Sequence, residues 1–303
     1  MHPLPFALPG RFWRGNLHTH TTNSDGFRST EQVCAFYRAM GYDFLSITDH
    51  FMAQFNFPIT DARAYESADF ITIPGAELHT GRTLTGEPWH ILANGIPFDF
   101  APPTADETGP QIAARALAAG AFVTCAHPAW YALSEAEVLS LGPVHAIETI
   151  NGISLDHSDR IDSWYMLDAL TNQGHRYLAL TTDDAHFHPK HNDRLLGWTM
   201  VKSETLSAPA ILDALKRGAY YSSSGPILET VEFDGRKTVY IRCSPVDSIF
   251  ITGRGSKSVY HHGNGMVEAE LGLERLGDSA FCRVTVRDDR SRHAWTNVIT
   301  FED

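Results

Sequence analysis

Residues 16–26 read NLHTHTTNSDG, and they place two histidines two positions apart at the end of a predicted strand. Side chains at such positions on a strand point to the same side, so one metal ion can bind both His18 and His20. Asp25 could reach a neighbouring ion across the turn that Gly26 permits. A single H-x-H pattern is weak evidence, and on this segment alone a structural role is about as well supported as a metal site.

A rhythm of helix, strand and polar strand end recurs along the chain. Ser29–Gln32 has the spacing of a capping box, and the helix that it opens is followed by a strand over 44–48 that runs into Asp49-His50. This alternation between residues 16 and 224 indicates a parallel sheet with crossover helices, whose carboxyl strand ends carry the chemistry. The further units are predicted as helices over 111–119, 134–141, 158–172 and 209–217 and strands over 121–125, 144–150 and 177–180.

Residues 226–303 follow a different pattern from the part that precedes them. Helical periodicity ends, short segments of alternating apolar and polar residues take its place, and Asp234-Gly235 gives the signal of a β-hairpin. We therefore predict an α/β barrel over residues 1–225 and a small antiparallel β module over 226–303 packed on it. The strands expected in the module are 238–243, 248–252, 267–271 and 281–286.

Composition and charge exclude several classes of protein. The 303 residues carry a formal net charge of -12, which repels polyanions, and no cluster of lysine and arginine offers a surface for a nucleic-acid polymer. No apolar run approaches the roughly 18 to 20 residues that cross a bilayer, and the first residues lack a basic start, so we expect a cytoplasmic protein without a membrane segment. The four cysteines form no C-x-x-C pair, and G-x-S-x-G, G-x-G-x-x-G and P-loop motifs are absent. The composition leaves the oligomeric state open.

Histidine is over-represented for a structural core, with 16 residues, and several lie beside acids at the ends of predicted strands. A buried ionisable group without a partner costs several kcal/mol, so a ring of such groups at one barrel mouth is best explained by cations that hold them together. The candidates beyond the first stretch are Asp49-His50, Glu77, His90, His127 and Asp183-Asp184-Ala185-His186.

The order of these motifs resembles that of the PHP (polymerase and histidinol phosphatase) superfamily. The tail segments 218–226 and 294–297 are similar to the ending of its CehA/McbA-like branch. The resemblance implies a distorted (β/α)7 barrel of PHP type that binds two or three divalent ions of zinc, manganese or iron. The matching motifs are H-x-H-x-x-x-x-D-G at 18–26, I-T-D-H at 47–50, P-G-A-E at 74–77, His90 before an apolar run, A-H-P at 126–128 and D-A-H at 184–186.

The resemblance also implies which residues bind each ion, and it gives Glu77 the role of a bridge between two ions. A catalytic role is implied for Glu77, Asp184 and His186. The ligand sets are His18, His20, Glu77 and Asp184 for the first ion, Glu77, His90 and His127 for the second, and Asp25, His50 and His186 for the third.

Two neighbours of these ligands leave alternatives. His79 competes with His90, and we prefer His90 because an apolar run follows it, as in the family, whereas His79 precedes the polar segment 80–82. Adjacent side chains on a strand diverge, so Asp183 is left to orient a ligand imidazole. Glu148 and Asn151, at another strand end, are expected to shape the pocket without binding metal.

The charge of such a site favours a hydrolase that acts on a small anionic molecule. The positive charge of three divalent ions exceeds the negative charge of the three ligand carboxylates and a bridging hydroxide, so the site would stay positive and favour an anionic substrate. A metal-activated hydroxide would then attack a phosphate ester of a metabolite or nucleotide. The same site could instead hydrolyse a carbamate, ester or amide. A non-catalytic, metal-stabilised interaction domain is a third alternative, and the filled ligand positions argue against it.

Cations for a substrate oxyanion are sought in the loops near the site. An arginine fork suits a phosphate oxygen, and the predicted substrate-binding residues are Arg194, Lys190 and Arg82. Each of them is alternatively a solvated surface charge. His188 and His191 share the loop of Arg194 and are expected to contact substrate or solvent, whereas His157 is assigned no role.

Overall fold

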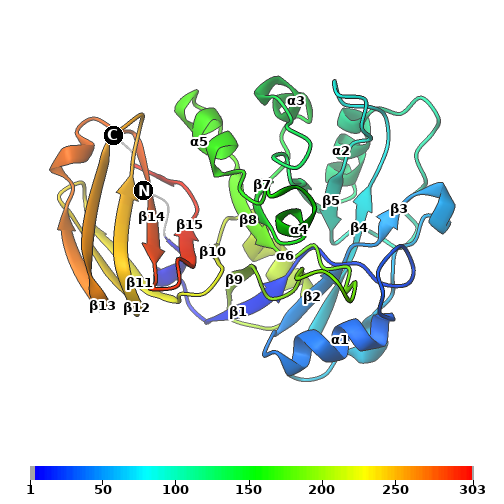
Figure 1. Cartoon of the computed structure of the whole chain (residues 1–303), viewed down its shortest axis with the longest axis horizontal. Helices are drawn as coiled ribbons and strands as arrows, with labels where there is room; N and C mark the ends of the chain where they lie inside the picture. Colours follow the sequence, from blue (N-terminus) through cyan, green and yellow to red (C-terminus); the bar gives the residue numbers. More distant parts are fainter. Residues whose placement is uncertain (1–3, 302–303) are drawn as a thin grey trace.

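Strands dominate this computed structural model, which describes residues 4–301 (Figure 1). The strands are β1 (Arg11–Asn16), β2 (Phe44–Ile47), β3 (His50–Phe51), β4 (Ile71–Leu78), β5 (Ile91–Asn94), β6 (Phe122–Cys125), β7 (Ala146–Asn151), β8 (Leu178–Thr182), β9 (Trp198–Ser203), β10 (Tyr220–Ser223), β11 (Leu228–Asp234), β12 (Thr238–Thr252), β13 (Ser258–Gly272), β14 (Phe281–Arg287), β15 (His293–Thr296) and β16 (Ile299–Thr300). The α-helices are α1 (Thr30–Ala39), α2 (Gly109–Ala118), α3 (Glu135–Ser140), α4 (Ser154–Ser158), α5 (Trp164–Asn172) and α6 (Ala208–Lys216).

The first two thirds of the chain form a mixed α/β fold. The strand order β10-β9-β1-β2-β4-β5-β6-β7-β8 contains two parallel runs, β1-β2-β4 and β6-β7-β8. The prediction of a wholly parallel sheet is wrong, because β5 is antiparallel to both of its neighbours and β9 is antiparallel to β1 and β10. The helices pack on this part of the sheet, and α1, α2 and α3 each begin with a capping box.

The strand directions explain why residues far apart in sequence meet at one edge of the sheet. Carboxyl ends of parallel strands lie at the same edge, which brings together the segments after β1, β4, β6 and β8. His90 precedes β5 rather than following it, but β5 runs in the opposite direction, so its amino end lies at this same edge.

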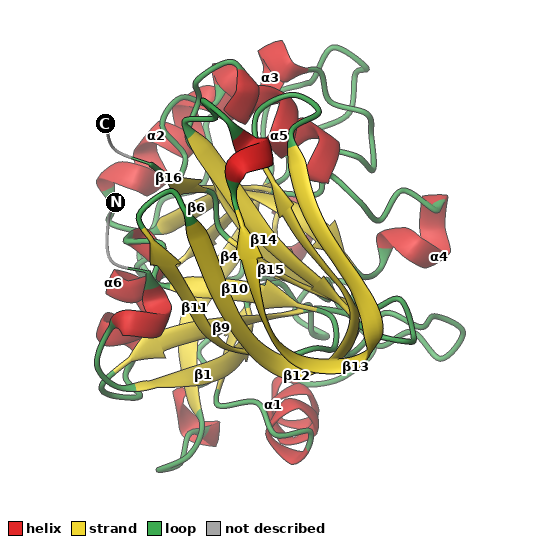
Figure 2. Ribbon diagram, turned by 90° about the vertical axis from the view of Figure 1, so that its left-hand side faces the viewer, coloured by secondary structure: helices red, strands yellow, loops and turns green. Residues whose placement is uncertain are grey.

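The C-terminal strands form an antiparallel sheet that is continuous with the rest. β15 pairs with β10, so hydrogen bonds cross from residues 1–225 into residues 226–303, and the division into two domains stays a prediction. The expected hairpin at Asp234-Gly235 is confirmed by the pairing of β11 with β12. The short strands predicted over 238–271 are wrong in length, because register irregularities interrupt the alternation within two continuous curved strands, β12 and β13 (Figure 2).

The predicted helix over 158–172 begins too early, because its helical part is α5. α4 ends before Asp159, which has a φ of 56°, and α5 begins only at Trp164. The left-handed residue turns the chain, so α4 stands apart as one short helix that carries His157. Among residues 4–301, no helix combines the length and the apolar character that crossing a bilayer requires.

Candidate metal centre

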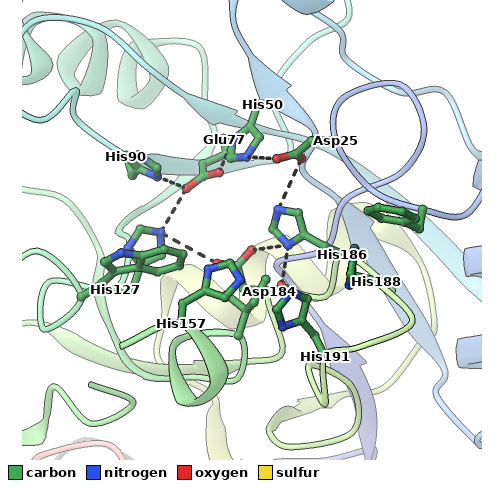
Figure 3. Close-up of a pocket in the computed structure, with 13 residues that line it drawn as sticks. Asp25, His50, Glu77, His90, His127, His157, Asp184, His186, His188 and His191 are labelled. Atoms are coloured by element: carbon green, nitrogen blue, oxygen red, sulfur yellow. Dashed lines mark hydrogen bonds and ion pairs between the residues drawn. The ribbon is translucent and has the colours of Figure 1, made fainter. Parts of the chain in front are cut away.

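A cavity of about 390 Å³ opens at the edge of the sheet where the strand ends meet (Figure 3). Its lining has two parts with different chemistry. We call the acids and histidines at the strand ends the floor, which consists of Asp25, His50, Glu77, His90, His127, Asp184 and His186. We call the remaining lining residues the rim, which consists of Phe27, Trp130, Ile153, His157, His188 and His191.

Four buried polar atoms, two of them from floor residues, converge beneath the cavity without a hydrogen-bond partner in the described chain. They are Nε2 of His18, Nε2 of His20, Oε2 of Glu77 and Oδ1 of Asp184. The Asp184 oxygen lies 3.1 Å from His18 Nε2 and 2.9 Å from His20 Nε2, and Glu77 Oε2 lies 3.7 and 3.6 Å from the same two nitrogens. Unmatched buried lone pairs are costly, and a divalent cation among them would satisfy all four. The residues of the first predicted ligand set therefore fit a metal ion.

The other oxygen of Glu77 faces a second group. Glu77 Oε1 lies 2.8 Å from His90 Nδ1 and 3.2 Å from His127 Nε2, so the carboxylate presents one oxygen to each of two groups. All three side chains offer ligand atoms close enough to share an ion. This is the arrangement that the predicted bridging role of Glu77 requires.

The third predicted set gathers around Asp25. Asp25 Oδ1 lies 3.3 Å from His186 Nε2, and Asp25 Oδ2 lies 3.4 Å from His50 Nε2. His20 belongs to the same group of potential ligands, so the third set adjoins the first. The structure thus brings together all nine residues that the sequence predicts as metal ligands.

A buried carboxylate that the sequence did not predict as a partner holds one of these imidazoles. Glu148 Oε1 lies 2.9 Å from His18 Nδ1, and its other oxygen accepts hydrogen bonds from the backbone N–H of His127 and the side chain of Asn151. A ligand histidine that donates its second N–H to a carboxylate is fixed in tautomer and orientation. Glu148 and Asn151 therefore do more than shape the pocket.

The role predicted for Asp183 is wrong. Its carboxylate contacts no ligand imidazole and accepts instead from the Tyr37 hydroxyl at 2.7 Å and from the backbone N–H groups of residues 195, 196 and 197. Both residues lie beyond the end of β8, and the expected strand alternation does not apply to them because Asp184 has a left-handed backbone. The Asp184 carboxylate contacts His18 and His20, whereas that of Asp183 meets a loop. It anchors the loop that follows the last metal motif.

Electrostatics keep the ligand carboxylates and two of the ligand imidazoles in the form that binds cations, whereas nearby acids overcome burial and raise the pKa of His18, His50 and His186. Burial raises the pKa of Glu77, but the surrounding imidazoles, His90 and His50 foremost, outweigh it and hold this pKa well below its usual range. Burial, reinforced by nearby imidazoles, lowers the pKa of His20 and of His90 to about 3. Burial disfavours protonation of His50 as well, yet Glu77 and Asp25 raise its pKa to about 10. A bound cation would take the place of that proton.

Two of the proposed ligands have an unusual backbone. His127 has a φ of 23° and Asp184 a φ of 52°, in the left-handed region that residues other than glycine rarely adopt. Such conformations persist where surrounding contacts enforce them, and they gather at functional sites. No sequence pattern in these motifs signals this feature.

The predicted substrate cations do not reach the cavity. Arg194 donates to the His191 carbonyl and lies 3.4 Å from Asp193, Arg82 donates to the Gly86 carbonyl, and Lys190 is exposed. Among the described residues that line the cavity there is no arginine or lysine. The two arginines contact their own loops and Lys190 is exposed outside the cavity lining, so the three substrate contacts stay predictions.

The rim contains residues that the sequence analysis missed. His157, left without a role, lies 5.2 Å from the ring of Trp130 and 4.8 Å from that of His191. Phe27 is 56% exposed and packs edge-on against His188. These residues come from separate loops and short helices, and only His188 and His191 could be placed near the site from their position after the last metal motif.

His79 lies beside the floor without lining the cavity. Its Nε2 is 2.8 Å from His50 Nδ1 and 3.4 Å from Glu77 Oε2. His90, in contrast, is one of the lining residues. This difference agrees with the preference for His90, although the ligand roles themselves stay predictions.

Comparison with solved structures identifies the fold. No protein-family model matches the chain, and no curated protein matches it. A two-domain protein from Bacteroides vulgatus, described as containing a predicted PHP-like metal-dependent phosphoesterase, matches 92% of this chain and 92% of its own with a TM-score of 0.53 at 15% identity. This chain has a PHP-like fold. Because the match covers more than residues 1–225, the similarity to this two-domain protein extends into the C-terminal sheet.

Two further solved structures match a smaller part of the chain. A putative metal-dependent phosphoesterase from Bifidobacterium adolescentis has 13% identity and a TM-score of 0.42 over 57% of this chain and 87% of its own. An amidohydrolase from Chromobacterium violaceum, with bound sulfate and no metal, has 15% identity and a TM-score of 0.43 over the same shares, 57% and 87%.

Proposed function

We propose that the chain is a hydrolase that depends on two or three divalent ions and acts on small phosphate esters. The observation that carries the proposal is the set of four converging buried atoms, from His18, His20, Glu77 and Asp184, without hydrogen-bond partners in the described chain. The PHP-like phosphoesterase among the structural matches supports the choice of phosphate esters. We also propose that residues 1–225 correspond to the distorted (β/α)7 barrel of PHP type and that zinc, manganese or iron is bound.

Each ligand set has its own place in this proposal. Divalent ions bound there would lower the pKa of a water molecule and offset the charge that develops on a transferring phosphoryl group. Glu77 would hold two ions at a fixed separation through its two oxygens, since these face different groups of imidazoles. Asp184 and His186 would complete the first and third sets, and the His186 ring is fixed by a 3.0 Å contact between its Nδ1 and the Asp184 carbonyl.

The rim would bind the part of the substrate that does not react. The imidazole of His157 lines the cavity and forms no hydrogen bond or ion pair with another described residue, since the one hydrogen bond of this residue is made by its backbone N–H to the Ile153 carbonyl. Its ring N–H could therefore donate to a substrate oxygen. The Trp130 ring, next to His157, and the Phe27 ring, next to His188, would offer apolar surface to the substrate.

One observation favours a second candidate, the hydrolysis of a carbamate, ester or amide. Phosphate sites commonly use arginine or lysine, and the described lining of this cavity contains neither. An uncharged carbonyl substrate would need no such cation and would fit the aromatic rim. The two candidates share the metal ligands and differ in the bond that is broken.

A substrate panel separates the two candidates. Purified protein reconstituted with Mn²⁺ or Zn²⁺ would be assayed on aryl phosphates, sugar phosphates and nucleotides and, in parallel, on aryl carbamates, esters and amides. We expect kcat/KM to be highest for a phosphate monoester, and Glu77→Gln prepared in the same way should lose that activity. Wild-type preference for a carbonyl substrate would select the second candidate, and undiminished activity in Glu77→Gln would contradict the bridging role of Glu77.

A further inference from the structure

His79 occupies a place beside the predicted ligands that none of the three ligand sets uses. It follows β4 directly, is 6% exposed, and its ring lies 4.7 Å from that of His50 and 4.2 Å from that of His90. Its Nδ1 has no hydrogen-bond partner among the described residues, and its Nε2 meets His50 Nδ1 at 2.8 Å. A buried histidine with one matched nitrogen, in contact with a proposed ligand, calls for a function.

The two nitrogens of His50 face different partners. Its Nε2 is directed at Asp25, 3.4 Å away, within the third ligand set. A neutral imidazole has one N–H and one lone pair, so Nε2 can bind an ion only when Nδ1 carries the proton. That N–H then needs an acceptor, because ligand histidines nearly always donate their second nitrogen.

Among the described residues, two acceptors lie near His50 Nδ1, and they differ in geometry. Glu77 Oε2 is 2.7 Å away, yet it makes no hydrogen bond and belongs to the converging atoms of the first set. The contact with His79 Nε2, at 2.8 Å, has hydrogen-bond geometry. An ion in the first set would commit Glu77 Oε2 and leave His79 as the acceptor.

We propose that His79 is a positioning residue for the third ion: its Nε2 accepts the Nδ1–H of His50 and thereby turns the Nε2 lone pair of His50 towards Asp25 and His186. This inference rests on the proposed metal-dependent function. From the sequence alone, His79 and His90 are alternatives for one ligand position. In this proposal His79 orients the ligand His50, and His90 is itself a ligand of the second ion.

Metal binding by two variants tests the role. Chelator-stripped protein would be titrated with Mn²⁺ by calorimetry, with the bound ions counted by elemental analysis. His79→Ala removes the acceptor, and we expect the third ion to bind about 10- to 100-fold more weakly while the first two are retained. His79→Gln places an amide oxygen near the position of Nε2 and should restore the third affinity to within a few-fold of wild type.

A double variant and a control separate positioning from general packing. If His79 acts through His50, then His50→Ala combined with His79→Ala should bind the third ion no more weakly than His50→Ala alone. His145→Ala is the control, because His145 is partly buried and accepts from the Val123 N–H outside the three ligand sets. Thermal melting of the stripped proteins would show that each variant is folded.

Each alternative outcome is distinct. Equal losses in His79→Ala and His79→Gln would overturn the acceptor role and indicate packing alone. Loss of the second ion in His79→Ala, with His90→Ala unaffected, would make His79 a ligand and overturn the proposal. A wild type with two ions contradicts only the role of His79, whereas a wild type that binds none contradicts the metal-dependent function as well.

Discussion

The floor and the rim of the cavity are built in different ways. The floor residues lie at or near strand ends of one sheet, all but Asp25 are buried or half-buried, and they include buried atoms without a hydrogen-bond partner in the described chain. The rim residues come from loops and from α4, and two of them, Phe27 and His157, are exposed. A sheet edge fixes where side chains meet, whereas a loop can place them in many ways. The floor should therefore determine whether chemistry occurs, and the rim which molecule undergoes it.

The largest effect is expected at the centre of the floor. Glu77→Gln removes one negative charge and the shared carboxylate, so both ions that face Glu77 should bind more weakly. We expect kcat/KM to fall by at least about a thousandfold, or ~4 kcal/mol of barrier. Elemental analysis of the folded variant would measure its metal content, and steady-state kinetics would measure kcat/KM. Full metal content with near-normal turnover would show that Glu77 does not bridge two ions.

A smaller loss is expected one layer behind the floor. Glu148→Gln weakens the hold on His18 Nδ1, and we expect the affinity of the first ion to fall by roughly 10- to 100-fold. Glu137→Gln is a matched control, because Glu137 is also a buried carboxylate but caps α3 through Ser134. Mn²⁺ titration of the two variants would decide the point. Equal affinities would show that Glu148 stabilises the fold and leaves the ions unaffected.

Substitution of a rim residue should weaken substrate binding and leave the metal content unchanged. His157→Ala removes one N–H that is free to bind substrate, and loss of about 1 kcal/mol would raise KM about fivefold while kcat changes less. The metal content should remain that of the wild type. Loss of metal ions in this variant would contradict the proposal that the floor binds the metals and the rim binds the substrate.

The smallest effect is expected at Arg194. The sequence predicts an oxyanion contact there, for which Arg194→Ala would cost ten- to a hundredfold in kcat/KM on a phosphate ester. The structure places its guanidinium on the His191 carbonyl and near Asp193, so we expect a change of less than about threefold. Kinetics below KM with metals confirmed in place would distinguish the two values.

The accuracy of the sequence analysis follows the same division. The positions of His18, Glu77 and His127 could be predicted because each lies at the end of a predicted strand, and these strand ends meet at one edge of the sheet. The order of their motifs along the chain also carries the family resemblance. The place of His157 was not, because it depends on the turn at Asp159 that separates α4 from α5. Arg194 does not line the cavity, and the loop beside it is held by Asp183 through residues 195–197, a contact that no local pattern encodes.

The central claim is that the buried ligand atoms hold divalent ions. Elemental analysis of protein purified without chelator, with activity assayed on the same sample before and after chelator treatment, tests it most directly. We predict at least two equivalents of zinc, manganese or iron per chain and loss of activity after chelator treatment that returns when metal is added back. Fewer than one equivalent in fully active protein would contradict the account.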